Sequence, residues 1–141
     1  MHRLSPRPRM YLIFAALLFC AVALHAKTIL LDETDHSTHI CLNVGDVLSV
    51  KLKSNVTTGY SWDTDSVPSC IREQQTKQKE KKNPRIGESG FQVFVFKATS
   101  PCNAVVTLHY FRPFEKDKPP AKIFSVDLSV QESSRNAGVS N

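Results

Sequence analysis

The side chains of this sequence that could act as general acids or bases are scattered singly. His36, His39 and His109 have no partner at a spacing typical of a catalytic set, so each is better explained as a surface or strand histidine. Asp63 and Asp65 are near neighbours, but a pair of this kind at a strand end ordinarily faces solvent. No Gly-x-Ser-x-Gly, His-Glu-x-x-His or Gly-x-x-x-x-Gly-Lys motif occurs. We therefore predict that the chain is not an enzyme and has no catalytic residue.

The cysteines could form disulfides or bind metal. Cys20 lies in an N-terminal apolar segment that we expect to be removed, which leaves Cys41, Cys70 and Cys102. In an exported chain, one disulfide and one further thiol is the simplest account of an odd number, and the sequence leaves all three pairings open. His39 and Cys41 are the only tight His/Cys pair, and no Cys-x-x-Cys motif accompanies them. We predict no metal site and no cofactor.

Three short segments contain residues suited to binding. Asn55-Val56-Thr57-Thr58-Gly59 has small side chains that expose backbone groups, and Gly59 permits a positive φ or the close approach of another backbone. Gly87-Glu88-Ser89-Gly90 precedes an apolar run. Arg112-Pro113-Phe114 places an arginine and a ring on either side of a rigid proline, and arginines and aromatic residues are enriched in binding hot spots. Each segment taken alone is also explained as an ordinary turn.

The elements that would position these segments are short strands. Apolar residues alternate with polar ones along 47–53 and 124–131, as in strands with one buried face. Segment 91–96 is apolar on both faces, and segment 105–111 places Val106, Leu108 and Tyr110 on one side. Weaker strand candidates are 28–31, 39–42, 60–63 and 70–76.

The pattern as a whole predicts an all-β fold. No segment of about 12 residues beyond the N-terminal apolar run has helical periodicity, and Gly, Pro, Asn and Ser separate the strands. Seven or eight short strands favour a two-sheet sandwich of the immunoglobulin-like type over a large barrel. Trp62, the only tryptophan, is expected to pack between the sheets.

The N-terminus is typical of a secretory signal peptide. Arg3, Arg7 and Arg9 precede an apolar run from Met10 to Leu24 that is too short to span a bilayer comfortably. Cleavage after Ala26 is one alternative, and cleavage three residues earlier, at Ala21-Val22-Ala23, is the other. We assign residues 1–26 to the signal, 27–131 to one domain and 132–141 to a flexible tail. We expect a protein that is secreted or lies in a periplasmic or vesicular lumen, with no stable membrane insertion after cleavage.

The charge balance argues against a nucleic-acid partner. The formal net charge is +5, but three of the 18 basic residues and none of the 13 acidic residues lie in the signal. The remaining 15 basic and 13 acidic residues give a net charge of +2. We interpret the basic run Lys77–Arg85 as a solvated hairpin or loop, and we expect a monomer.

Taken in order, the three segments resemble the chagasin family of cysteine-peptidase inhibitors. Asn55-Val-Thr-Thr-Gly-Tyr-Ser-Trp62, then Gly87-Glu-Ser-Gly90, then Arg112-Pro-Phe114 follow the order and spacing of that family's motifs. The resemblance implies an immunoglobulin-like sandwich whose three loops gather at one end. It also implies reversible binding to papain-like cysteine peptidases, with the loop from Asn55 to Gly59 in the active-site cleft, Tyr60 at the base of that loop and the other two loops on its flanks.

Two positions depart from the family pattern. Val56 stands where the family usually has proline, so the preset φ of proline is lost. Phe114 stands where it usually has tryptophan, which keeps a ring but removes the indole donor. An alternative function is an exported immunoglobulin-like adhesion or ligand-binding module, since this fold has many functions.

Overall fold

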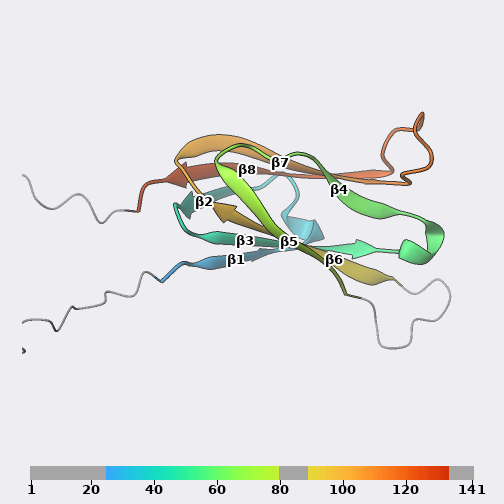
Figure 1. The fold of residues 1–141 in the computed structure, drawn as a ribbon, viewed down its shortest axis with the longest axis horizontal. Helices are drawn as coiled ribbons and strands as arrows, with labels where there is room; N and C mark the ends of the chain where they lie inside the picture. The colour runs from blue at the N-terminus through green and yellow to red at the C-terminus, as the bar shows by residue number, and fades with distance from the viewer. Residues whose placement is uncertain (1–24, 80–88, 134–141) are drawn as a thin grey trace, which may run out of the picture.

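Eight strands form two four-stranded sheets within residues 25–79 and 89–133, the part of the chain that the computed structural model describes (Figure 1). The strands are β1 (Thr28–Leu31), β2 (His39–Asn43), β3 (Val47–Ser54), β4 (Ser61–Ser66), β5 (Ile71–Lys79), β6 (Gly90–Ala98), β7 (Cys102–Phe111) and β8 (Lys122–Gln131). Two 3₁₀ turns, η1 (Glu33–Asp35) and η2 (Val56–Thr58), lie in the connections. Most of the predicted signal and tail, at 1–24 and 134–141, lies outside the described residues.

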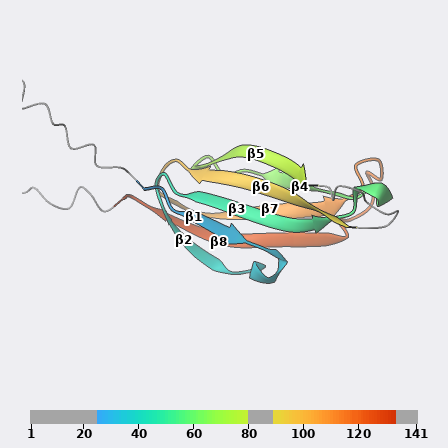
Figure 2. The same cartoon turned by 90° about the horizontal axis from the view of Figure 1, so that it is seen from below.

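The two sheets have the orders β1-β3-β6-β5 and β2-β8-β7-β4. The pairs β1–β3 and β2–β8 are parallel, and the other pairs are antiparallel. The first two strands therefore belong to different sheets, and the segment that contains η1 crosses from one sheet to the other (Figure 2). The predicted all-β, immunoglobulin-like sandwich is confirmed.

The core lies between the sheets and follows the alternation of the sequence. Leu48, Val50 and Leu52 of β3 are fully buried, as are Val106 and Leu108 of β7. The even-numbered residues of β8 from Phe124 to Val130 are buried beside those of β7 in the same sheet, and together they face the β3 residues of the other sheet. Burial of each of these side chains stabilises the fold by about 1.5–3 kcal/mol. A shift of one residue would expose all of them, so the alternation of apolar and polar residues determines which face of each strand is buried.

One inward position of β6 is polar rather than apolar. Gln92 is 5% exposed, and its amide contacts the backbone of Trp62 in the opposite sheet. The Trp62 N–H donates to Gln92 Oε1 at 2.9 Å, and Gln92 Nε2 donates to the Trp62 carbonyl oxygen at 2.7 Å. Both polar groups of the amide are thus satisfied in the core, and they hold β4 against β6. Trp62 is itself buried, as predicted.

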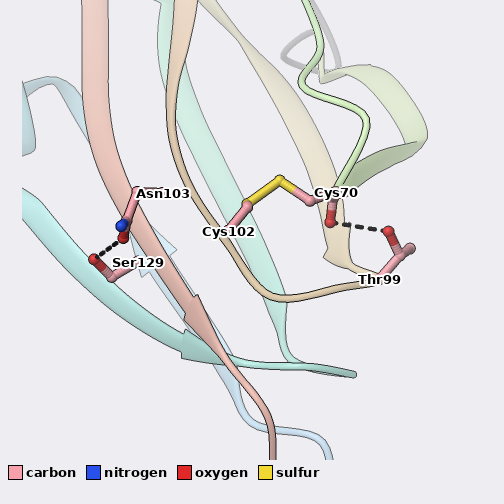
Figure 3. The surroundings of a disulfide bond; sticks show 5 residues. All are labelled: Cys70, Thr99, Cys102, Asn103 and Ser129. Carbon is pink, nitrogen blue, oxygen red and sulfur yellow. Dashed lines mark hydrogen bonds between the residues drawn. A yellow bond between two sulfur atoms is a disulfide. The ribbon is translucent and has the colours of Figure 1, made fainter.

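The two ends of the sandwich differ. The loops β3–β4 and β7–β8 lie at one end, while the start of β1 and the end of β8 lie at the other (Figure 1). A disulfide links Cys70, just before β5, to Cys102, the first residue of β7 (Figure 3). Beside it, the Thr99 hydroxyl donates to the Cys70 carbonyl oxygen at 2.9 Å. The structure thus selects one of the three pairings left open by the sequence, and Cys41 is an exposed free thiol.

Candidate functional site

The loop between β3 and β4 is held by its own side chains. Residues Val56–Thr58 form the 3₁₀ turn η2, in which the Thr58 N–H donates to the Asn55 carbonyl oxygen at 3.2 Å. The Thr58 hydroxyl donates to the same carbonyl at 2.7 Å, and the Thr57 hydroxyl donates to Asn55 Oδ1 at 2.6 Å. Short polar side chains commonly organise a turn in this way. Although Val56 stands where a proline would preset φ, the threonine hydroxyls and Asn55 stabilise the turn.

A column of stacked side chains supports this loop from below. The Arg112 guanidinium carbon lies 4.4 Å from the ring centroid of Tyr60. Tyr60 in turn stacks on Tyr110 at 5.2 Å between centroids, and Tyr110 lies 5.0 Å from Trp62. The Tyr110 hydroxyl accepts a hydrogen bond from the Asn55 N–H at 3.0 Å. The column therefore runs from the surface loop to the buried tryptophan and joins β4 to β7.

The base of the same loop is tied to β3. The indole N–H of Trp62 donates to the Lys53 carbonyl oxygen at 2.8 Å, across the root of the loop. Because Trp62 is buried and also paired with Gln92, this bond fixes where the loop leaves the sandwich. The tryptophan thus acts both as a core residue and as an anchor of the loop.

Arg112 connects the β7–β8 loop to the β3–β4 loop. Its Nε donates to the Thr58 carbonyl oxygen at 3.1 Å, and one terminal nitrogen pairs with Glu115 Oε1 at 3.2 Å. Lys118 lies 3.2 Å from the same carboxylate oxygen. The hydrogen bond from Lys118, followed by that from Arg112, holds the pKa of Glu115 below its ordinary value against partial desolvation. Glu115 therefore stays ionised and orients the guanidinium.

Phe114 packs directly against Gly59. Gly59 has a φ of +79°, and a Cβ added there would lie 2.9 Å from Phe114 Cε1. The sequence predicted a positive φ or a close approach at this glycine; the positive φ is confirmed, and the neighbour is the chain's own ring. Phe114 is nevertheless 70% exposed, so its other face is open to solvent.

The predicted site residues that the structure describes are brought together at this end of the sandwich. Thr57, Thr58, Pro113 and Phe114 are exposed, while Asn55, Gly59, Tyr60 and Arg112 are half-buried beneath them. Gly90 pairs with Ser54 at the end of β3, so β6 begins beside the root of the β3–β4 loop, and Ser89 is exposed next to it. The predicted residues Gly87 and Glu88 lie outside the described residues.

Sequence reasoning missed the groups that hold these loops. Tyr110 was assigned to a strand face, although its hydroxyl and ring both support the β3–β4 loop. Glu115 was not singled out, although it binds Arg112. The pairs are 55 residues apart for Asn55 and Tyr110 and 54 for Thr58 and Arg112, so local pattern could not reveal them. The available signal in the sequence was the presence of Tyr60 and Trp62 next to the Asn55–Gly59 segment, since both residues turn out to support that loop.

The described residues contain no group of three or more His, Cys, Asp and Glu side chains arranged to hold a metal ion. In the same part of the chain, no helix has the length and hydrophobicity needed to cross a bilayer.

Comparisons with known proteins identify the family of this chain, a relative in sequence and solved structures of similar fold. A family model described as chagasin family peptidase inhibitor I42 matches residues 41–128. Amoebiasin-2 of Entamoeba histolytica is 29% identical over 122 residues, which cover 84% of this chain and 97% of that protein. The crystal structure of the cysteine protease inhibitor EhICP2 from Entamoeba histolytica has a TM-score of 0.70 at 21% identity, over 76% of this chain and 98% of that one. The solution structure of amebosin has a TM-score of 0.62 at 24% identity, over 76% and 100%.

Proposed function

This chain belongs to the chagasin family of peptidase inhibitors, and from that premise we propose that it blocks the active-site cleft of papain-like cysteine peptidases with the exposed tip of the β3–β4 loop. The family consists of inhibitors, so the prediction that the chain is not an enzyme is confirmed. The observation that carries the proposal is the rigid support of Thr57 and Thr58, two exposed residues whose loop is fixed from both sides.

The loop geometry suits an inhibitor that is not itself cleaved. A peptidase attacks the carbonyl of an extended, correctly aligned peptide, whereas residues 56–58 form a 3₁₀ turn. The Asn55 carbonyl accepts two hydrogen bonds within the turn, and the Thr58 carbonyl accepts one from Arg112. The loop can therefore fill a narrow cleft while its flanking carbonyls are held in internal hydrogen bonds.

Preorganisation lowers the cost of binding. Ordering a flexible side chain at an interface costs about 0.5–1.5 kcal/mol. The Thr57 and Thr58 hydroxyls and the Arg112 guanidinium are already fixed in the free protein, so little of this cost remains for them. Phe114, exposed beside Gly59, would supply an apolar contact on the flank of the cleft.

Ser89 and Gly90, with Gly87 and Glu88, would form the second flanking contact, in which a segment with small side chains gains affinity through main-chain hydrogen bonds. The N-terminal basic and apolar pattern supports export to an extracellular, periplasmic or vesicular space. The protein would act there as a monomer.

Titration of papain with the purified protein tests the function. We expect competitive inhibition that is complete near a stoichiometric ratio, and no effect on trypsin at the same concentration. Equal inhibition of both enzymes, or no response from several papain-like enzymes, would rule the proposal out.

A matched pair of variants locates the site. Thr57→Glu/Thr58→Glu should weaken inhibition by about a hundredfold or more, because central contacts dominate interfaces. Thr28→Glu/Asn43→Glu adds the same charge at exposed strand positions near the opposite end and should leave inhibition intact. Circular dichroism should show both variants folded. Unchanged inhibition by a folded Thr57→Glu/Thr58→Glu protein would show that the loop assignment is wrong.

A further inference from the structure

The charges of the strands are divided unequally between the two sheets. Strands β1, β3, β6 and β5 contain six lysines or arginines and one carboxylate, Glu73. Strands β2, β8, β7 and β4 contain three aspartates and one lysine, Lys122, at the start of β8. The net charge of the chain after signal removal is small because the strands of the first sheet are net positive and those of the second sheet are net negative.

Most of these basic residues lie on the outer face of the first sheet. Their partners in the ladder show the arrangement: Lys53 pairs with Phe91, and Val93 pairs with Lys51 on one side and Lys77 on the other. Further along, Lys97 pairs with Arg72. Five exposed side chains make up what we call the basic face: Lys51, Lys53, Arg72, Lys77 and Lys97. They come from three adjacent strands, which run side by side in Figure 2.

An apolar stripe runs between the cations. Phe91, Val93 and Val95 follow one another on the outer side of β6 and are half-buried. The Lys51 ammonium lies 4.1 Å from the ring centroid of Phe91 and covers it. Long lysine stems cover apolar surface in this way while their charged ends stay in water. The basic face thus presents the two lysines of β3 on one side of the apolar stripe and the two cations of β5 on the other, with Lys97 at the end of the stripe itself.

Two carboxylates, Asp32 and Glu33, lie beside Lys51 and Lys53 at the β3 side of this face, but neither forms an ion pair with them. Asp32 accepts hydrogen bonds from the Thr34 hydroxyl and N–H, and Glu33 accepts one from the Lys53 N–H. Between described residues, the ion pairs are those of Glu115 with Arg112 and Lys118, at the loop end of the sandwich. The cations of the basic face are therefore not neutralised by ion pairs with described carboxylates.

We propose that the basic face binds a sulfated polysaccharide chain. Residues two apart on a strand are about 7 Å apart, so the lysine pair of β3 presents successive cations along one direction, as a linear polyanion requires. A bilayer is a poorer fit, because Leu30 is the one strongly exposed apolar side chain on the described strands of this sheet and the half-buried stripe lies below the lysine ends. Single-stranded nucleic acid is a poorer fit because Lys51 covers the one aromatic ring available for stacking.

The face and the peptidase-binding loops occupy different parts of the molecule. The cations lie along the side of the sandwich, whereas Thr57, Thr58 and Phe114 lie on the loops at its end (Figure 1). A polysaccharide that lies along β6 from Val93 to Lys97 therefore leaves these loops free, whereas Gly90, at the start of the same strand, belongs to the second flanking contact. The consequence is an inhibitor that can be retained on a sulfated matrix while it remains able to bind its enzyme.

Isothermal titration of the purified protein with heparin tests the site. Lys53→Gln/Lys77→Gln should weaken heparin binding by about tenfold or more, at about a fivefold loss for each cation near an anionic surface. The slope of log K against log salt should fall by about two, because two fewer counterions are released. Lys116→Gln/Lys122→Gln, which removes the same charge from the other sheet and the β7–β8 loop, should bind nearly as well as wild type. Lys51→Gln/Lys77→Gln, which alters no residue that holds the loops, should likewise weaken heparin binding and leave papain inhibition unchanged.

Other outcomes overturn the proposal. Equal weakening by both double variants would mean that net charge, not this face, governs binding. Absence of heparin binding by the wild type would remove the site altogether. Tighter binding to phosphatidylserine vesicles or to DNA than to heparin would assign the face to a membrane or a nucleic acid. Self-association in sedimentation, abolished by Lys53→Gln/Lys77→Gln, would assign it to a second copy of this chain.

Discussion

The ring of Phe114 occupies the space that a side chain at residue 59 would need, because a Cβ added to Gly59 would lie 2.9 Å from Phe114 Cε1. Gly59 also has a φ of +79°, which other residues adopt at a cost of about 1–2 kcal/mol. Two separate constraints thus select glycine, one within the β3–β4 loop and one from the β7–β8 loop. The two loops are therefore fitted to each other before any partner is bound.

Gly59→Ala should separate these constraints when it is compared with Gly45→Ala. Both glycines have a positive φ, but a Cβ at Gly45 would have no atom within 4 Å. We expect both variants to lose about 1–2 kcal/mol of stability in urea unfolding. Only Gly59→Ala should also weaken papain inhibition, because it displaces Phe114. Equal inhibition by the two variants would show that the fit between the loops is irrelevant to binding.

Arg112→Lys should weaken inhibition by about tenfold or more, although the charge is kept. A lysine cannot both donate to the Thr58 carbonyl and lie flat on Tyr60, as the guanidinium does. Loss of a hydrogen bond from a charged donor costs about 1.5–3 kcal/mol. Lys118→Gln is the control, since it removes a charge from the same loop without touching Thr58. Inhibition constants measured against papain decide between them, and a stronger effect of Lys118→Gln would contradict the role of Arg112.

The fold was predictable from the sequence because strand alternation is a local signal. Leu48, Val50 and Leu52 alternate with less apolar residues within the seven positions 47–53, and this alternation alone identifies the buried face of the strand. The supports of the site are long-range pairs of ordinary residues. A glutamine at position 92 and a tyrosine at position 110 look the same in sequence whether or not they bind the backbone of Trp62 or Asn55. The disulfide was undecidable for the same reason, because only the fold brings Cys70 to Cys102.

Removal of the disulfide should reduce stability and spare function. Cys70 and Cys102 are 32 residues apart, and closing a loop of this size contributes about 3–4 kcal/mol. Cys70→Ser/Cys102→Ser should therefore unfold at a lower temperature but inhibit papain normally below that temperature, since Cys102 begins β7 and the β7–β8 loop follows the far end of that strand. Cys41→Ser controls for loss of an exposed thiol. A folded double variant without inhibition would mean that the disulfide positions the site.

The stabilising effect of Glu115 should disappear in acid. Its pKa is lowered in the folded state from an ordinary value of 4.5, mainly by the hydrogen bond from Lys118. A carboxylate with a lowered folded pKa stabilises the protein above its unfolded pKa and loses this effect as the pH falls through the folded pKa. Wild type should therefore exceed Glu115→Gln in unfolding free energy at neutral pH, and the gap should close below pH 4.5. Glu132→Gln removes a carboxylate at an exposed site after β8 and controls for the loss of one negative charge.

The motif that forms the loop is also an acceptor for N-glycosylation. Asn55-Val56-Thr57 fits the Asn-x-Ser/Thr pattern, which proline at the middle position would forbid. Asn55 lies directly beneath Thr57, whose hydroxyl it binds, so an oligosaccharide attached there would cover the exposed tip of the loop. A group of that bulk cannot enter a narrow cleft. Glycosylated protein should consequently be heavier and unable to inhibit papain.

Val56→Pro provides the matched test of this effect. Residue 56 is the first of the 3₁₀ turn, a position where proline is tolerated, so the turn should be preserved while the acceptor is destroyed. Material from a eukaryotic secretory pathway should gain mass and lose inhibition in the wild type, regain inhibition on enzymatic deglycosylation, and remain light and active as Val56→Pro. Mass spectrometry and papain titration measure both quantities. If protein fully glycosylated at Asn55 inhibits as well as the unmodified protein, the loop from Asn55 to Gly59 is not the part that enters the cleft.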